Sequence, residues 1–271
     1  MNKMIVGNLK MNLLTVVERD RYLESLKKEI KGRELSNCEI VICCPSIHLE
    51  SFVSQKEGGN FSIGAQNIFW EERGSFTGEI SGPMVKNIGA EFVIIGHSER
   101  RKFFNETNEI VKTKINAALS ANLIPICCVG ETLEDRQNGK TAEVITNQIH
   151  EGLADVPISK ITSVVIAYEP VWAVGSDSVP TSDEIMEVRI LLKKIFADTF
   201  GVPVAEKMKM LYGGSVKAST AKQLCLDPGM DGVLVGRESL IPMEFIKIAE
   251  ILSQNTIDKI QNTADNENIK K

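Results

Sequence analysis

The amino-acid sequence predicts an α/β fold, a single (β/α)8 barrel in which eight parallel strands alternate with helices. Eight short apolar runs recur along the 271 residues, and helical patterns separate them. Most of these runs are apolar without alternation, which is typical of parallel strands that are covered on both faces. A chain of this length with 43% apolar residues can form one large core as one domain.

The predicted strands are Met4–Gly7, Glu39–Cys44, Phe61–Ala65, Glu91–Gly96, Leu123–Gly130, Ser163–Tyr168, Lys209–Gly214 and Asp231–Gly236. The clearest predicted helices are Glu106–Ala121, Thr132–Gly152 and Ser182–Phe200. Ser182, followed by two acidic residues, is a typical helix start. A doubly wound open sheet is the alternative fold, but no GxGxxG follows the first strand and eight units fit the barrel better.

No linker divides the chain, so we expect one barrel domain over residues 1–252. Residues 253–271 are polar and lack a clear apolar stripe. We expect this C-terminal tail to be a frayed extension or a short surface helix.

Charge and hydropathy limit the partners and the compartment. The net charge of −5 provides no basic footprint for nucleic acid, and it means that an anionic substrate has to be held by local groups. The first ten residues lack the apolar region of a signal peptide, and no run of about 18 apolar residues occurs. We therefore expect a cytoplasmic protein without a membrane partner.

Six cysteines are present, four of them as the adjacent pairs Cys43–Cys44 and Cys127–Cys128 within apolar runs. Neighbours in a strand point to opposite faces, and no CxxC occurs, so neither a zinc site nor an internal disulfide is expected. The pattern predicts reduced, buried thiols and no metal.

In a barrel, the carboxyl ends of all strands meet at one face, where the chemistry takes place. The polar residues that follow the predicted strands are Asn8, Lys10, Gln66, Asn67, His97, Ser98, Glu99, Glu131 and Glu169. Each has a structural explanation of its own, such as a solvated Lys10 or an ion pair between Glu131 and Arg136. A carboxylate, an imidazole and an ammonium group at one rim nevertheless form a proton-transfer set. His48 and His150 are expected on the surface.

Glycine-rich turns follow the last two predicted strands. Gly213 and Gly214 precede Ser215, and Gly236 ends the eighth strand. Glycine lets the backbone approach a ligand closely, and helix N-termini present unpaired N–H groups to an anion. The loops after strands seven and eight are the usual phosphate site of such barrels, so the sequence predicts a phosphate monoester as substrate.

The segments GNLKMN, GAQN, GSFTGE, GHSERR, CVGE, AYEPVWAVG, YGGSV and DGVLVG occur in this order. Together they closely resemble the triosephosphate isomerase family over roughly residues 4–250. The resemblance implies a cofactor-independent isomerase that interconverts dihydroxyacetone phosphate and D-glyceraldehyde 3-phosphate through an enediolate, in glycolysis and gluconeogenesis. This family is itself the standard example of the barrel fold.

The resemblance also implies roles for individual residues. Glu169 matches the catalytic base, and His97 matches the neutral electrophile for which this family is the standard example. Lys10 matches the group that stabilises negative charge on the substrate, and Asn8 matches a residue that positions it. The implied phosphate-binding set is Gly175, Ser215, Gly236 and the backbone N–H of Arg237, and the implied supporting positions are Ser98, Glu99 and Thr77.

Two loops carry further implications. Thr77 matches a loop that reaches a partner subunit in the family, and Phe76 in the same segment, Glu71–Glu79, is apolar, so we expect a homodimer. Residues 170–172 resemble the first hinge of a lid that keeps water from the intermediate.

The sequence departs from the family pattern at three places: Leu9 replaces tryptophan, Ser178–Val179–Pro180 forms the second hinge, and Arg237–Glu238 replaces a smaller pair. None of these removes a proton-transfer residue.

Two other functions compete, namely an enzyme for another phosphosugar and an inactive paralogue that serves as a binding or scaffold protein. The intact set of Asn8, Lys10, His97 and Glu169 argues against the inactive paralogue.

Overall fold

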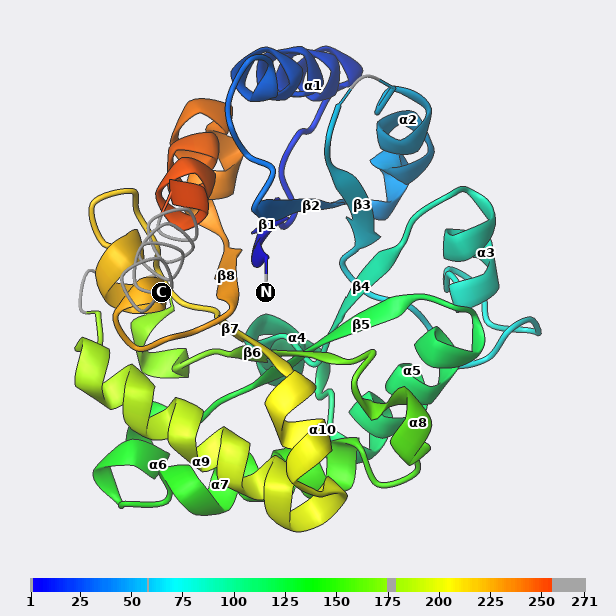
Figure 1. The fold of residues 1–271 in the computed structure, drawn as a ribbon. Coiled ribbons are helices and arrows are strands. Elements are labelled where there is room, and N and C mark those ends of the chain that lie inside the picture. The colour runs from blue at the N-terminus through cyan, green and yellow to red at the C-terminus, as the bar shows by residue number, and fades with distance from the viewer. Residues whose placement is uncertain (1, 58, 175–178, 255–271) are drawn as a thin grey trace, which may run out of the picture.

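The computed structural model describes residues 2–57, 59–174 and 179–254. Within them, parallel strands β1 to β8 close into a barrel in sequence order, as the sequence predicts (Figure 1). The strands are β1 (Lys3–Asn8), β2 (Cys38–Cys44), β3 (Ser62–Ala65), β4 (Phe92–Ile95), β5 (Ile124–Val129), β6 (Val165–Tyr168), β7 (Lys209–Tyr212) and β8 (Gly232–Val235). Gly7, which ends the first predicted run, lies within β1. The glycines that end the other runs, Gly96, Gly130, Gly214 and Gly236, lie beyond the strands, in the loops at the carboxyl rim.

Helices form a layer around the barrel (Figure 1). They are α1 (Val16–Ile30), α2 (Leu49–Ser54), α3 (Gly82–Asn87), α4 (Ser98–Phe104), α5 (Asn108–Ser120), α6 (Leu133–Gln137), α7 (Thr141–Gly152), α8 (Ile158–Ile161), α9 (Ser182–Phe200), α10 (Val202–Lys207) and a last helix over residues 242–254. Short helical turns are η1 (Ser46–His48), η2 (Val171–Ala173), η3 (Lys222–Leu226) and η4 (Arg237–Leu240).

The strands are apolar throughout because each of them buries both faces. In β1, Met4 and Val6 belong to a cluster inside the barrel, whereas Ile5 packs in the larger cluster between the sheet and the helices. All three side chains are almost completely buried. This alternation between two apolar environments explains why the strands read as continuous apolar runs.

The predicted helix Thr132–Gly152 is wrong, because the segment forms two helices, α6 and α7. Gly139 between them has φ +69°, a left-handed conformation that ends α6. Thr132 caps α6 in a capping box with Asp135, whose backbone N–H donates to Thr132 Oγ1 at 3.1 Å.

Helix α9 spans Ser182–Phe200 as predicted, whereas the start of the predicted helix Glu106–Ala121 differs. The cap of α9 is Thr181 rather than Ser182, and it forms a capping box with Glu184. Helix α5 begins at Asn108 with Thr107 as its cap, so Glu106 lies before the helix. The acidic residues near the two helix starts indicated where each helix lies. They did not indicate which threonine caps it, that is, which hydroxyl accepts from the backbone N–H of the third helical residue.

The last helix extends through Gln254, two residues past the predicted domain boundary. Ser253 is buried, and its hydroxyl donates to the carbonyl oxygen of Glu34 at 3.2 Å. Ser253 and Gln254 therefore belong to the barrel's outer layer. The remainder of the predicted tail, residues 255–271, lies outside the described residues.

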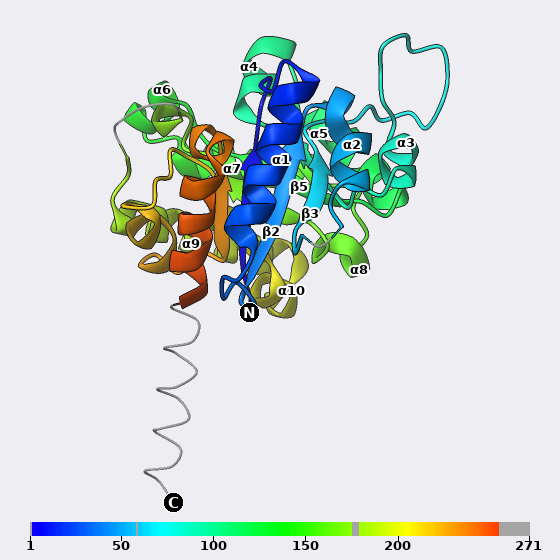
Figure 2. The same ribbon diagram turned by 90° about the horizontal axis from the view of Figure 1, so that it is seen from above.

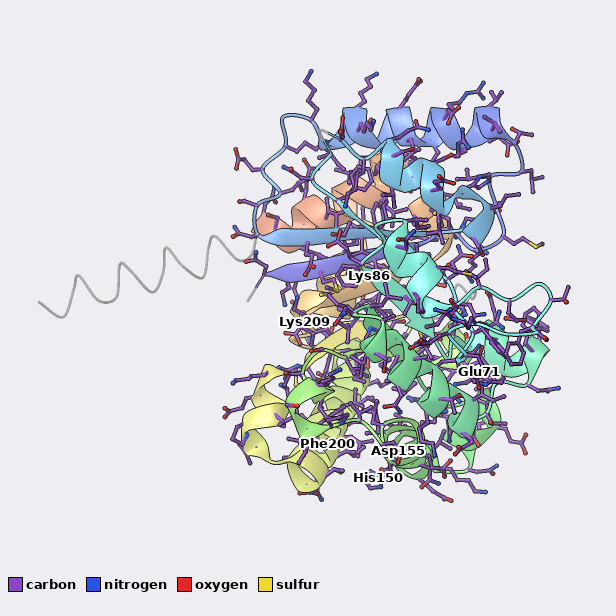
Figure 3. All side chains as sticks on the ribbon, turned by 90° about the vertical axis from the view of Figure 1, so that its right-hand side faces the viewer. Glu71, Lys86, His150, Asp155, Phe200 and Lys209 are labelled. Atoms are coloured by element: carbon purple, nitrogen blue, oxygen red, sulfur yellow. The ribbon has the colours of Figure 1, made fainter. Side chains whose placement is uncertain are left out.

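The loop between β3 and α3 projects from the body of the barrel (Figure 2). Glu71 in this loop and Lys209 at the start of β7 lie toward opposite ends of the barrel (Figure 3). Phe76 near the tip is 42% exposed, although its ring lies 4.7 Å from that of Phe69. The loop thus presents partly exposed aromatic surface at the end that carries the carboxyl rim.

The expectation for His48 is wrong, because this side chain is buried and its Nε2 lies 2.7 Å from the carbonyl oxygen of Leu13. His150 lies on the outer surface of α7, as predicted (Figure 3). All six cysteines are buried, which confirms the predicted burial of their thiols. No helix in the described part of the chain is long and apolar enough to cross a membrane.

Candidate active site

A cavity of about 260 Å³ opens at the carboxyl rim, between the loops that follow several strands. The predicted residues that line it are Asn8, Lys10, His97, Glu169, Ser215, Gly236 and Arg237. These residues come from the ends of five strands, so the fold has brought distant segments together. Gly175 and Ser178, which the sequence places in the phosphate site and the lid, lie outside the described residues.

Glu169 directly follows β6 and its side chain is almost completely buried. Its Oε1 lies 3.1 Å from Nε2 of His97, and its Oε2 accepts a hydrogen bond of 2.9 Å from the backbone N–H of Ser98. The thiol of Cys128 also lies close by. Burial, and then the Glu169 carboxylate, raise the pKa of that thiol well above its usual value, so Cys128 is a neutral neighbour.

His97 caps the N-terminus of α4, which determines its tautomer. Its Nδ1 accepts a hydrogen bond of 3.2 Å from the backbone N–H of Glu99. An accepting Nδ1 carries a lone pair, so the proton of the neutral ring lies on Nε2. That N–H faces Glu169 and the cavity, and it is available as a hydrogen-bond donor to a ligand oxygen.

Lys10 adopts a left-handed backbone conformation with φ 51°, which is unusual for a residue with a side chain. Side chains hold it there: its N–H donates to Asn8 Oδ1 at 3.0 Å, and its carbonyl accepts from Gln66 Nε2 at 2.9 Å. Its ammonium group pairs with Glu99 Oε1 at 2.6 Å. Lys10 is therefore directed to the cavity rather than freely solvated.

The loops after β7 and β8 form the other side of the cavity. Ser215 Oγ donates to the carbonyl oxygen of Ala173 at 3.1 Å, which joins the glycine-rich turn to the first segment of the predicted lid. A Cβ at Gly213 would lie 2.8 Å from Cγ of Glu169, so this glycine allows the turn to pack against the carboxylate. Arg237 is exposed and begins η4.

Glu131 is fully buried beside the predicted lid hinge. Its Oε1 accepts hydrogen bonds from Trp172 Nε1 at 3.0 Å and from Tyr168 Oη at 3.2 Å. Arg136 lies 3.6 Å away, so the proposed ion pair is present, and its guanidinium also stacks over the Trp172 ring. Glu131 thus contacts the predicted hinge and does not line the cavity.

Sequence reasoning missed a buried ionic cluster around Glu106, which is paired with Arg100 at 2.6 Å and with Lys114. Burial opposes ionisation, yet the hydrogen bonds from Arg100 and Lys114 lower the pKa of Glu106 below its usual value. Lys114 also donates to Asn67 Oδ1 at 2.7 Å. The residues are separated in sequence and follow no local pattern, so only the fold reveals the cluster.

The supporting positions contribute in different ways. Ser98 offers its backbone N–H to Glu169, and Glu99 pairs with Lys10. Thr77 is exposed on the loop before α3 and does not line the cavity. Asn12, Lys217 and Glu238 line the cavity in addition to the predicted set.

A family model described as triosephosphate isomerase matches residues 3–252. The triosephosphate isomerase of Alkaliphilus oremlandii (strain OhILAs) is 42% identical over 244 residues, which cover 90% of this chain and 97% of that protein. That of Clostridium tetani (strain Massachusetts / E88) is 43% identical over 90% of this chain and 94% of its own length. The crystal structure of triosephosphate isomerase from Bartonella henselae superposes with a TM-score of 0.82 at 36% identity, covering 93% of this chain and 99% of that one. On this evidence the chain belongs to the triosephosphate isomerase family.

Proposed function

We propose that Glu169, His97 and Lys10 carry out, in this cavity, the isomerisation of triose phosphates that defines the family. The reaction interconverts dihydroxyacetone phosphate and D-glyceraldehyde 3-phosphate in glycolysis. The observation that supports the assignment is the contact of 3.1 Å between Glu169 Oε1 and His97 Nε2, a base and an N–H donor facing one cavity.

Each group has a distinct task. Glu169 removes a proton from the carbon next to the substrate carbonyl, while His97 Nε2–H donates to the carbonyl oxygen as it becomes negative. Lys10 stabilises the same developing charge. Because Glu169 Oε2 accepts a hydrogen bond from the Ser98 N–H, the carboxylate has to turn from that N–H to reach the reacting carbon. The lid then excludes water from the enediolate.

The test is a coupled assay of the purified chain with each triose phosphate in turn. Turnover in both directions, with little activity on pentose or hexose phosphates, is the expected result. Preference for a larger phosphosugar would favour the alternative enzyme, and absence of turnover with retained phosphate binding would favour a binding protein.

The proposed phosphate-binding part of the cavity, next to the loop after β8, leads to a prediction for Arg237. We propose that its backbone N–H binds the phosphate, as a glycine's would, and that its exposed guanidinium contributes little. Replacing Arg237 with Gly should therefore change KM by less than about fivefold, or about 1 kcal/mol. Steady-state kinetics at several ionic strengths measure this change.

A direct bond from the guanidinium to the phosphate would contribute about 1.5–3 kcal/mol. A rise in KM of tenfold or more, together with a weaker dependence of KM on salt, would place the arginine side chain in the phosphate site. Glu238→Gln is the matched control, because it changes the neighbouring charge of the same turn and leaves the backbone N–H groups in place.

We also propose that the chain forms a two-fold homodimer through the loops at this rim. Met11, Leu14 and Ile47 are each more than four-fifths exposed, and the contact of His48 with Leu13 places their two segments side by side. Exposed apolar residues gathered in this way are typical of an interaction surface. Phe76, which is also partly exposed, would pack against this surface of the other subunit.

Sedimentation at micromolar concentration should show a dimer, and Phe76→Ser should shift the chain toward monomer with reduced activity. A fully active monomer would contradict the proposal. Removal of residues 255–271 should leave dimerisation and activity unchanged, because the described barrel ends at Gln254 and the family match ends at 252.

We further propose a cytoplasmic location without nucleic-acid or membrane partners, in keeping with the net charge of −5.

A further inference from the structure

We propose that Arg101 is a positioning residue for the isomerisation, which fixes the turn that carries His97 relative to the strand that supports Glu169. The inference rests on the roles proposed above for His97 and Glu169. Arg101 lies in α4 and does not line the cavity, so it acts through the backbone rather than on the substrate.

The turn before His97 lies after the last residue pair of the β4–β5 ladder. The paired register of β4 with β5 ends at Ile95 and Cys127, so the peptide groups of Gly96 lack a strand partner there. Side chains supply the hydrogen-bond partners instead. The Gly96 N–H donates to Glu106 Oε2 at 3.3 Å, and the Gly96 carbonyl oxygen accepts from Arg101 Nε at 2.9 Å. Buried backbone groups need such partners, and here both partners are charged.

The conformation of Gly96 makes this support necessary. Its φ is +71°, and a Cβ at this position would lie 2.9 Å from Val111 and 3.1 Å from Arg101 Nη2. A glycine loses more backbone freedom on ordering than other residues, so a glycine turn is precise only when its neighbours restrain it. The two charged side chains supply that restraint on either side of the peptide that leads into His97.

The same guanidinium extends to the next strand. Arg101 Nη2 donates to the carbonyl oxygen of Cys128 at 3.4 Å, the weaker of its backbone bonds, and Nη1 donates to Asn108 Oδ1 at 2.7 Å. The carbonyl oxygen of Val129, the residue after Cys128, accepts a hydrogen bond of 2.7 Å from the backbone N–H of Glu169. Arg101 therefore bridges the His97 turn and the β5 segment on which Glu169 is anchored.

The planar fork of arginine is suited to this bridge, because Nε and the two Nη atoms donate in fixed directions. A lysine keeps the charge but offers a single nitrogen, which cannot serve both carbonyls with the same geometry. Since the productive arrangement of catalytic groups tolerates a displacement of less than about 1 Å, loosening this turn should slow the reaction more than it weakens substrate binding.

A purely structural role for Arg101 is the competing explanation, because a cation near the C-terminus of α4 also stabilises the helix. That role predicts a lower unfolding temperature with normal turnover wherever the variant remains folded. The positioning role predicts a lower kcat in a fully folded enzyme, together with a change at the His97 ring.

The experiment uses full-length Arg101→Met and Arg101→Lys, with kcat and KM measured well below the unfolding temperature of each variant. We expect kcat to fall about 10- to 100-fold while KM stays within about threefold. Protein labelled with ¹⁵N-histidine adds a direct readout, because the chain has three histidines. The imidazole signals of His97 should shift, and those of His150 should not.

Arg33→Met is the control, because the guanidinium of Arg33 also joins separate segments, here by pairing with the carboxylates of Glu29 and Glu250, but Arg33 precedes β2 at the other end of the barrel. It should lower stability without changing kcat or the His97 signals. Turnover of Arg101→Met within twofold of the unmodified enzyme would overturn the inference, and so would a loss of activity that disappears on cooling.

If Arg101→Met does not fold, the same measurements on Arg101→Lys decide the question by the same criteria. Glu169→Gln, assayed alongside, separates this inference from the proposed roles. Substantial turnover in Glu169→Gln would refute those roles whatever Arg101 does. An inactive Glu169→Gln with normal Arg101 variants would refute only the positioning role.

Discussion

Replacement of Glu169 by Gln should lower kcat by at least about two to four orders of magnitude, with a modest change in KM. The amide is nearly isosteric and can still accept the hydrogen bond of the Ser98 N–H, so the local packing should survive. It cannot accept the proton from substrate carbon, and in the described cavity no other carboxylate reaches His97 Nε2. The coupled assay in both directions measures this loss.

The matched control is Glu39→Gln. Glu39 also lies in a barrel strand, but it pairs with Lys209 at 2.9 Å at the opposite end of the barrel from the cavity. Its kcat should equal that of the unmodified enzyme. Near-normal turnover in Glu169→Gln would show that another group removes the proton.

Replacement of His97 by Asn should lower kcat by about two to three orders of magnitude, the usual effect of losing one donor to a developing oxyanion. The side-chain oxygen of Asn can replace Nδ1 as the acceptor for the Glu99 N–H, because Asn is a favourable helix cap. Asn is too short to place a donor where Nε2 lies. The substitution therefore separates the capping role of His97 from its role as electrophile.

His150→Asn provides the comparison, since His150 is exposed in α7, where its Nε2 lies 2.9 Å from Oγ1 of Thr199. It should leave kcat unchanged. If His97→Asn lowered stability but kept kcat within a few-fold, the imidazole would be a structural cap and the electrophile would have to be sought among the other donors of the cavity.

The barrel could be predicted from the sequence because burial on both faces leaves a direct trace. Strands such as β4 and β8 are completely buried, and they read as short apolar runs with polar or glycine-rich turns after them. Glu169 was recognisable for the same reason, as an acid directly after an apolar strand. The ordered series of short segments then identified the family.

The bounds of α9, Ser182–Phe200, agree with the prediction, but helix caps and other helix boundaries were predicted less well, because they depend on single side chains. Thr181 rather than Ser182 caps α9, and Gly139 divides the segment after β5 into two helices. Both features follow from backbone dihedral angles and hydrogen bonds that a pattern of polar and apolar residues does not specify. His48 was misplaced on the surface because its burial depends on the loop after β1, which covers it.

The fold class, the family and the residue types at the rim could be predicted from the amino-acid sequence, since they follow from local composition and from motifs contiguous in the chain. Which of these groups contact one another became known from the three-dimensional arrangement of the strands and loops. Lys10 pairs with Glu99, 89 residues away, and Glu106, Arg101 and Gly96 form one hydrogen-bonded turn. Such contacts depend on where the closing barrel brings separate strand ends together, and the periodicity of each segment carries no record of the partner that lies across from it.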